Sequence, residues 1–178
     1  MLIIFGGLPG SGKTTIARAL AKRLGAVHLR IDTIEQTVRD SGMLRSEVGP
    51  AGYMVGYALA EDNLTLGNIV VADSVNSLTI TRDAWVSVAA RAGVRAVEIE
   101  IVCSDKVEHR RRVETRASDI PGLINPSWEK VITRDYDDWG QRPTVIDSAM
   151  LSVDQAVAEL MSKLGPAQIG DRIFDTRL

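Results

Sequence analysis

Residues 7–14 read GLPGSGKT, and this stretch decides the fold. It matches the pattern G-x-x-x-x-G-K-[ST], in which glycines allow successive backbone N–H groups to turn inward around a phosphate. A short apolar run at residues 2–5 precedes the loop, and a helical pattern of apolar residues follows from Gly12 to Leu24. Because the motif requires a strand before the loop and a helix after it, we prefer it to a plain glycine turn.

The residue types in this loop predict how a nucleotide is held. Lys13 is expected to reach the β- and γ-phosphate oxygens and to act in catalysis, and Thr14 is expected to ligate Mg²⁺. The positive end of the following helix favours an anion at the same place. The expected cofactors are therefore ATP and Mg²⁺, and a loop that binds nucleotide without chemistry remains an alternative. The expected nucleotide-binding residues are Leu8, Pro9, Gly10, Ser11, Gly12, Lys13, Thr14, Thr15 and Arg112.

Apolar runs alternate with helical patterns along the rest of the chain. Further strands are expected at residues 27–31, 69–72, 94–102 and 144–146. Helices are expected at residues 32–39, 50–66, 81–92, 104–116, 126–139 and 152–164. Strands separated by helices are typical of βαβ units, so the predicted class is α/β with a mostly parallel sheet in one domain.

Two carboxylates follow predicted strands. Asp73 closes the run NIVVAD, and we expect it to hold Mg²⁺ together with Thr14. Asp32 closes the run HLRID, and we expect it to accept a hydroxyl proton or to bind the substrate. The carboxyl ends of parallel strands form the edge where ligands bind, which favours both roles. A helix cap or a turn is the alternative for each residue.

The charged segment SDKVEHRRRVETR predicts a helix with cations on one face. Arg112 and Arg116 lie four residues apart, so they share that face. Such a face is explained if it closes over a polyphosphate and offsets the charge that develops in phosphoryl transfer. We therefore predict a lid at about residues 104–122, with both arginines catalytic. A solvated surface compensated by Glu108 and Glu114 is the alternative.

The segment after the strand predicted at residues 69–72 carries two further candidates. Asn76 and Arg82 follow Asp73 near the same sheet edge, and we expect them to hold the substrate. Loop and capping roles are the alternative. His28 is expected to be structural rather than catalytic.

Composition excludes several classes of protein. The 178 residues carry a formal net charge of -2, which disfavours a nucleic-acid binder. The single cysteine, Cys103, excludes an intrachain disulfide. No apolar stretch approaches the ~20 residues of a transmembrane helix, and the start of the chain lacks a basic region typical of a signal peptide. We expect a cytoplasmic protein without membrane contact. The sequence leaves the oligomeric state open.

Several longer segments resemble a known family. GLPGSGKTT, RIDTIEQTVR, VVADSVNSLTITRDAW, CSDKVEHRRRVETR and VIDSA are similar to segments of the small AAA-type ATP-binding proteins allied to zeta toxins, chloramphenicol phosphotransferase and the kinase domain of polynucleotide kinase. The resemblance spans roughly residues 1–150. It implies a P-loop NTPase fold with a five-stranded parallel sheet of order 2-3-1-4-5, helices on both faces and a short lid.

The same resemblance implies an activity and several roles. The activity is transfer of the ATP γ-phosphate to a hydroxyl. Asp32 matches the family's general base, and Arg112 and Arg116 match its lid arginines. Asp73 and Asn76 match positions near the metal and the acceptor, and residues 146–149 match a loop near the adenine.

The residues and the resemblance together predict a kinase that phosphorylates a small-molecule hydroxyl. An ATP-dependent regulatory module with slow hydrolysis and a 5′-hydroxyl polynucleotide kinase remain as alternatives. The chain closes with a predicted C-terminal helix and tail, residues 152–178, whose role the sequence leaves open.

Overall fold

A computed structural model of the protein describes residues 1–43, 47–140 and 143–165. The strands are β1 (Leu2–Gly6), β2 (Val27–Arg30), β3 (Val70–Asp73), β4 (Ala96–Val102) and β5 (Thr144–Asp147). The helices are α1 (Lys13–Leu24), α2 (Ile31–Asp40), α3 (Ala51–Thr65), α4 (Thr79–Arg91), α5 (Lys106–Thr115), α6 (Trp128–Ile132) and α7 (Val153–Leu164). The predicted tail beyond residue 165 lies outside the described residues.

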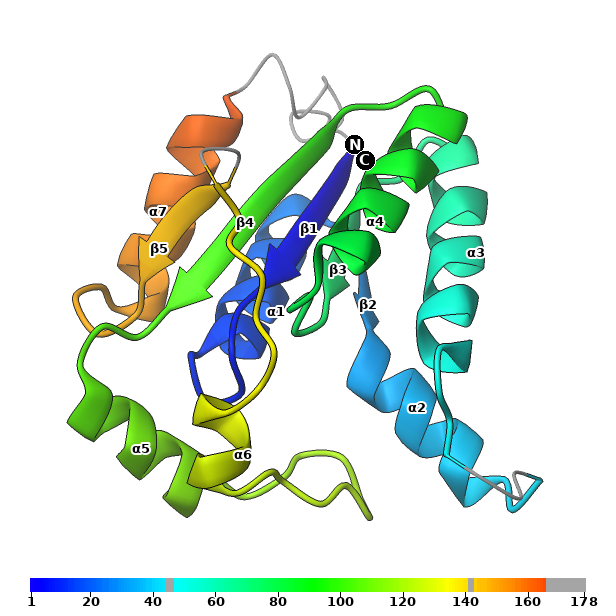
Figure 1. The fold of residues 1–178 in the computed structure, drawn as a ribbon. Coiled ribbons are helices and arrows are strands. Elements are labelled where there is room, and N and C mark those ends of the chain that lie inside the picture. The colour runs from blue at the N-terminus through cyan, green and yellow to red at the C-terminus, as the bar shows by residue number, and fades with distance from the viewer. Residues whose placement is uncertain (44–46, 141–142, 166–178) are drawn as a thin grey trace, which may run out of the picture.

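The five strands form one parallel sheet in the order β2-β3-β1-β4-β5, as predicted. The order places β1 in the centre, and the chain crosses from β2 to β3 and then over β1 to β4. Figure 1 shows that all strand arrows point toward the end of the molecule where α2, α5 and α6 lie. The loops that carry the predicted site therefore gather at this carboxyl edge.

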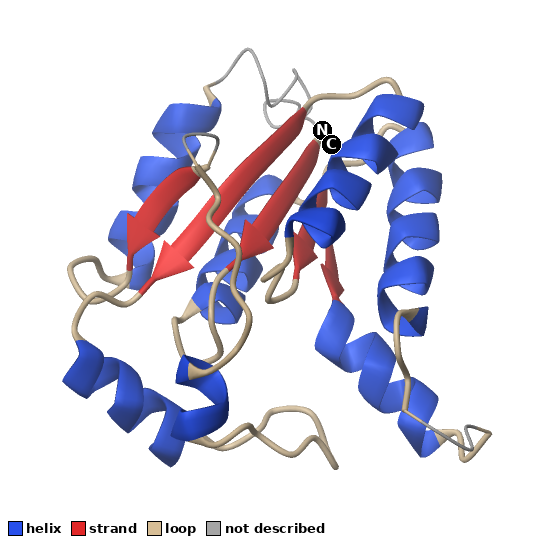
Figure 2. Ribbon diagram, in the orientation of Figure 1, coloured by secondary structure: helices blue, strands red, loops and turns tan. Residues whose placement is uncertain are grey.

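Each face of the sheet is covered by helices (Figure 2). Ile3 and Phe5 of β1 pack in one core cluster with α1 and α7. Leu2 and Ile4 pack in a second cluster with α3 and α4. Side chains alternate between faces along a strand, so an uninterrupted apolar run fits a strand buried on both sides. These four side chains are fully buried. The core on both faces of the sheet therefore holds β1, and with it the start of the loop that follows, in place.

Two predicted elements differ from the observed ones. Asp32 does not end β2 but lies in the first turn of α2, whose N-cap position is Arg30. The helix predicted at residues 126–139 is only α6, with Ser127 as its N-cap. Beyond its C-cap, Thr133, the chain is no longer helical, and the carbonyls of Asp137 and Asp138 accept hydrogen bonds from Arg82.

No helix among the described residues is long and apolar enough to cross a membrane.

Candidate active site

The phosphate loop connects β1 to α1 and is held under α5. Gly10 and Gly12 have φ values of 84° and 88°, which a residue with a side chain rarely adopts. A Cβ atom at Gly10 would also collide with the Val113 side chain of α5. The ring of His109 donates from Nε2 to the carbonyl oxygen of Pro9 at 2.9 Å. The loop therefore needs glycine both for its backbone and for the close approach of α5.

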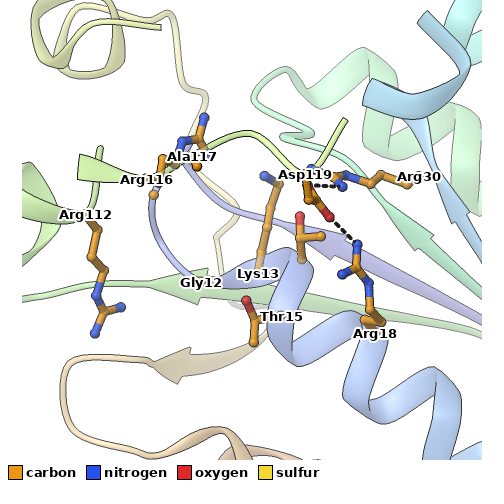
Figure 3. A pocket seen from close by; sticks show the side chains of 11 residues that line it. Gly12, Lys13, Thr15, Arg18, Arg30, Arg112, Arg116, Ala117 and Asp119 are labelled. Atoms are coloured by element: carbon orange, nitrogen blue, oxygen red, sulfur yellow. Dashed lines mark hydrogen bonds and ion pairs between the residues drawn. The ribbon is translucent and has the colours of Figure 1, made fainter. Parts of the chain in front are cut away.

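The first cavity at this loop has a volume of about 330 Å³. Lys13 extends into it and is only 6% exposed. Its lining combines loop residues, several arginines and a single carboxylate: Gly10, Gly12, Lys13, Thr14, Thr15, Arg18, Arg30, Arg112, Arg116, Ala117 and Asp119 (Figure 3). The excess of cations suits a polyphosphate. We refer to it as the phosphate cavity.

Thr14 and Asp73 meet at the floor of the site, as a shared metal role requires. Thr14 donates from Oγ1 to Asp73 Oδ1 at 3.3 Å, and His28 Nε2 lies 3.3 Å from Asp73 Oδ2. Burial alone would raise the pKa of Asp73, but the contact with His28 and the charge of Lys13 hold that pKa below its usual value. The carboxylate is therefore ionised near neutral pH.

A hydroxyl and an ionised carboxylate are oxygen donors that fit Mg²⁺. Mg²⁺ is usually held by one or two protein oxygens, with water and substrate phosphates completing its shell. Thr14 and Asp73 supply such a pair beside the phosphate loop. The described residues contain no cluster of three or more His, Cys, Asp and Glu side chains that could hold a metal.

A second, larger cavity of about 690 Å³ adjoins the first, and we refer to it as the acceptor cavity. Its lining mixes both charge signs with a few apolar groups: Pro9, Lys13, Asp32, Glu35, Gln36, Arg39, Glu47, Val75, Arg116, Gly122, Leu123, Ile124, Asn125, Pro126, Lys130 and Arg134. Lys13 and Arg116 line both cavities. The two cavities therefore meet at two cations.

Asp32 enters the acceptor cavity from the first turn of α2, and its side chain is 37% exposed. The Arg30 Nε atom lies 3.9 Å from Asp32 Oδ2. One turn further along α2, burial and the charge of Asp32 raise the pKa of Glu35. The acceptor cavity thus contains an accessible carboxylate with a guanidinium beside it.

The two predicted lid arginines have different surroundings. Arg112 donates to the hydroxyl of Ser148 at 2.8 Å and to the Ser148 carbonyl at 3.1 Å, and the Ser148 hydroxyl donates to the Ser11 carbonyl at 2.6 Å. Arg112 therefore joins α5 to the loop after β5 and to the phosphate loop. Arg116 is the C-cap of α5, and burial lowers its pKa.

The predicted loop residues do not all face the same space. Pro9 lines the acceptor cavity, whereas Gly10, Gly12, Lys13, Thr14 and Thr15 line the phosphate cavity. Leu8 and Ser11 instead line a third cavity of about 260 Å³, together with Ile101 and Tyr136.

The predicted substrate role of Asn76 and Arg82 requires correction. Both side chains are fully buried, and neither lines the acceptor cavity. Asn76 donates to the Phe5 carbonyl at 2.8 Å and accepts from Trp85 Nε1 at 3.2 Å. Arg82 donates to backbone carbonyls, including Asp138, and stacks on the Trp139 ring at 4.6 Å. These contacts use the polar groups of both residues to hold loops against the sheet.

Sequence reasoning misses three charged residues of the phosphate cavity. Arg18 lies four residues after Thr14, so helical spacing could have placed it on the same face of α1. Arg30 precedes Asp32 at the end of β2, and the carboxyl edge of the sheet could have identified it. No local pattern marks Asp119, because it reaches the cavity only through the fold.

Comparison with known proteins identifies the family of this chain. Residues 2–122 match the family model described as "AAA domain". A shikimate kinase from Corynebacterium efficiens is 30% identical over 149 residues, which are 74% of this chain and 83% of that protein.

Two solved structures have similar folds. A candidate kinase from Chloroflexus aurantiacus superposes with a TM-score of 0.71 at 24% identity, covering 92% of this chain and 94% of that one. A gluconokinase from Sinorhizobium meliloti superposes with a TM-score of 0.62 at 18% identity, covering 98% of this chain and 97% of that one.

Proposed function

Because this chain belongs to the AAA domain family of P-loop kinases, we propose that it transfers the ATP γ-phosphate to a hydroxyl group of a small molecule. The observation that carries the proposal is the meeting of two cavities at Lys13 and Arg116. One cavity contains the phosphate loop, and the other contains an accessible carboxylate, Asp32. A donor phosphate and an acceptor hydroxyl would then approach each other between two cations.

The loop residues and the cations have separate roles in this reaction. Backbone N–H groups of the loop and the N-terminus of α1 bind the β-phosphate, and Lys13 contacts the β- and γ-phosphate oxygens. Arg116 stabilises the negative charge on the transferring group from the acceptor side. Arg112 keeps α5 and the Ser148 loop against the phosphate loop through its hydrogen bonds.

Asp32 is the residue that we propose to activate the acceptor. Its carboxylate accepts the hydroxyl proton as the new O–P bond forms and the bond to ADP breaks. Glu35 also lines the acceptor cavity, but its carboxylate is already paired with Arg39 at 3.5 Å. Thr14 and Asp73 would hold Mg²⁺, which neutralises charge on the phosphates when bound.

The lining of the acceptor cavity supports a polar small molecule. It contains five cations and three carboxylates, Lys13, Arg39, Arg116, Lys130, Arg134, Asp32, Glu35 and Glu47. It contains no aromatic side chain among the described residues, so it offers no stacking platform for nucleobases. Shikimate kinase and gluconokinase are named for polar hydroxyl compounds, and we propose an acceptor of this general chemistry.

The test is a screen of hydroxyl metabolites with γ-labelled ATP, with shikimate and gluconate as the first compounds. A labelled product is expected, and Asp32→Asn is expected to lower its rate by about 10²–10⁴-fold while ADP binding is retained. An unchanged rate in Asp32→Asn would remove Asp32 as the base.

The same labelled ATP distinguishes the alternatives. A labelled 5′-hydroxyl oligonucleotide would indicate a polynucleotide kinase. ATP-dependent capture of a protein without any labelled product would indicate a regulatory module.

A further inference from the structure

Arg30 occupies a position between two carboxylates from distant parts of the chain. It is the last residue of β2, and its side chain is only 13% exposed. Its Nη1 atom donates to Asp119 Oδ1 at 2.8 Å. On the other side, its Nε atom lies 3.9 Å from Asp32 Oδ2, as noted above. The guanidinium is planar and rigid, so fixing one edge of it limits where the other edge can lie.

The Arg30 Nε atom is buried and has no hydrogen-bond partner. A buried donor without a partner is unfavourable, and the carboxylate oxygen of Asp32 lies 3.9 Å from this one. A small rotation of the Asp32 side chain would bring it to hydrogen-bond distance. The geometry therefore provides a fixed donor against which Asp32 can be oriented.

Asp119 fixes Arg30 from the segment that follows α5. Its second oxygen accepts from Arg18 Nη2 of α1 at 2.7 Å (Figure 3). These hydrogen bonds, first with Arg18 and then with Arg30, lower the pKa of Asp119 to about 2. The carboxylate is ionised at neutral pH and bridges two cations that would otherwise repel each other. The segment of residues 116–127, here called the lid loop, is thereby tied to both α1 and β2.

We propose that Arg30 is a positioning residue for Asp32, and that Asp119 holds Arg30 in place when the lid loop lies over the phosphate cavity. The inference rests on the proposed function, because it assigns Asp32 the task of accepting the hydroxyl proton. The proposal couples two events. The carboxylate of Asp32 is oriented only when Asp119 of the lid loop is hydrogen-bonded to Arg30. Phosphoryl transfer is then favoured in the closed site, from which water is excluded.

The kinetic test uses Arg30→Gln, Asp119→Asn and the double variant, all measured with saturating ATP and acceptor. Misplacing a reacting group by about 1 Å can cost 10²-fold, so Arg30→Gln should lower kcat by about 10- to 100-fold. Asp119→Asn should lower it less, by about 10-fold, because Arg30 remains near Asp32. Since Asp119 acts through Arg30, the double variant should be no slower than Arg30→Gln alone. The loss should fall mainly on kcat, with a smaller rise in the KM for ATP because Arg30 and Asp119 also line the phosphate cavity. Asp119→Glu should recover most of the lost rate.

A second measurement follows the lid loop without any acceptor. Hydrogen exchange of backbone amides in residues 117–126 should be faster in Asp119→Asn than in the unmodified protein, because the loop opens more often. Exchange in α7 should be unchanged, which shows that the variant is folded. The matched control is Glu61→Gln, which breaks the 2.6 Å pair with Arg91 between α3 and α4. It should alter neither kcat nor exchange of the lid loop.

The outcomes separate this inference from the proposed function. A normal rate in Arg30→Gln, with a large loss in Asp32→Asn, would overturn the positioning role while keeping the kinase. If the loss of kcat in the double variant equalled the product of the two single losses, Asp119 would not act through Arg30, and the coupling would be overturned. If no acceptor is phosphorylated, the exchange experiment decides alone: equal exchange in Asp119→Asn and the unmodified protein would overturn the inference.

Discussion

The phosphate cavity and the acceptor cavity share two cations but are built in different ways. The phosphate cavity takes five of its residues from one short segment, Gly10–Thr15, and adds arginines from α1, β2 and α5. The acceptor cavity takes most of its residues from α2, α6 and the connections around them, with both charge signs present. The first is an anion site set by backbone geometry, and the second is a surface whose chemistry depends on separate side chains.

This difference indicates where variation in substrate can arise. A change in the phosphate cavity disturbs backbone positions that the sheet and α5 hold, as the contact between Gly10 and Val113 illustrates. A change in the acceptor cavity alters one exposed or half-buried side chain on a helix or loop. Under the proposed function, the same nucleotide chemistry can therefore serve different acceptors, because most residues that line the acceptor cavity lie outside the phosphate loop.

Lys13→Ala is expected to have the largest effect, because Lys13 lies where the phosphate cavity and the acceptor cavity meet. The Lys13 side chain is nearly buried and lines both cavities, so its removal takes a cation from the place where they meet. We expect a loss of about 10³-fold in kcat/KM and weaker ATP binding. Isothermal titration with ATP and the transfer assay measure the two effects. Intact binding together with intact transfer would contradict the assignment of both cavities.

Arg116→Gln tests whether the second shared cation acts on the transition state. We expect a loss of about 10²-fold in kcat with little change in ADP affinity. The reason is that Arg116 interacts more strongly with the charge that develops in the transition state than with the bound nucleotide. The matched control is Arg110→Gln on the same helix. Arg110 pairs with Glu114 at 2.8 Å and lines neither cavity, so its variant should keep the rate. Equal losses in both would show a general effect on α5.

Arg134→Gln tests the independence of the acceptor cavity. Arg134 lines this cavity alone, so the acceptor KM should rise by about 10-fold while the ATP KM stays unchanged. Arg95→Gln, an exposed arginine at the opposite end of the sheet, should change neither constant. A rise in the ATP KM would show that the cavities are not separate binding surfaces.

The smallest expected effect concerns stability and pH. The pKa of Glu35 is raised by burial and by Asp32, so ionised Glu35 weakens the fold above its folded pKa. Glu35→Gln removes that charge, and the Tm at pH 7 should rise on the order of 1–3 °C. Below the unfolded pKa of about 4.3 both proteins carry a neutral side chain, so the gain should disappear. Thermal unfolding at pH 7 and pH 3.5 measures it.

Glu61→Gln is the control for this Tm change, because the pKa of Glu61 is shifted in the direction opposite to that of Glu35. Its hydrogen bond with Arg91 lowers the pKa of Glu61, so the substitution should not raise the Tm at pH 7. A gain in Glu35→Gln that persists at pH 3.5 would contradict the electrostatic explanation.

The sequence predicted the parts of the site that depend on local pattern. Lys13 and Thr14 follow from a contiguous motif, and Asp73 follows from its position after a buried strand. Thr14 Oγ1 and Asp73 Oδ1 lie 3.3 Å apart, and their metal role stays a prediction. Asn76 and Arg82 were assigned to the substrate because polar residues after a strand usually face the ligand edge. That pattern cannot tell an exposed polar group from one that satisfies buried loops, as both residues do here.

The sequence by itself determined the α/β class and the phosphate loop, since strand burial, helical spacing and glycine conformation are local properties. The resemblance to a known family supplied the strand order. Only the tertiary structure decided that Asp119 joins Arg18 and Arg30, which lie 101 and 89 residues away in the chain. Only the tertiary structure also showed that Lys13 and Arg116 lie where the two cavities meet. Such contacts join residues from separate elements, so they depend on how the helices and loops pack at the carboxyl edge of the sheet.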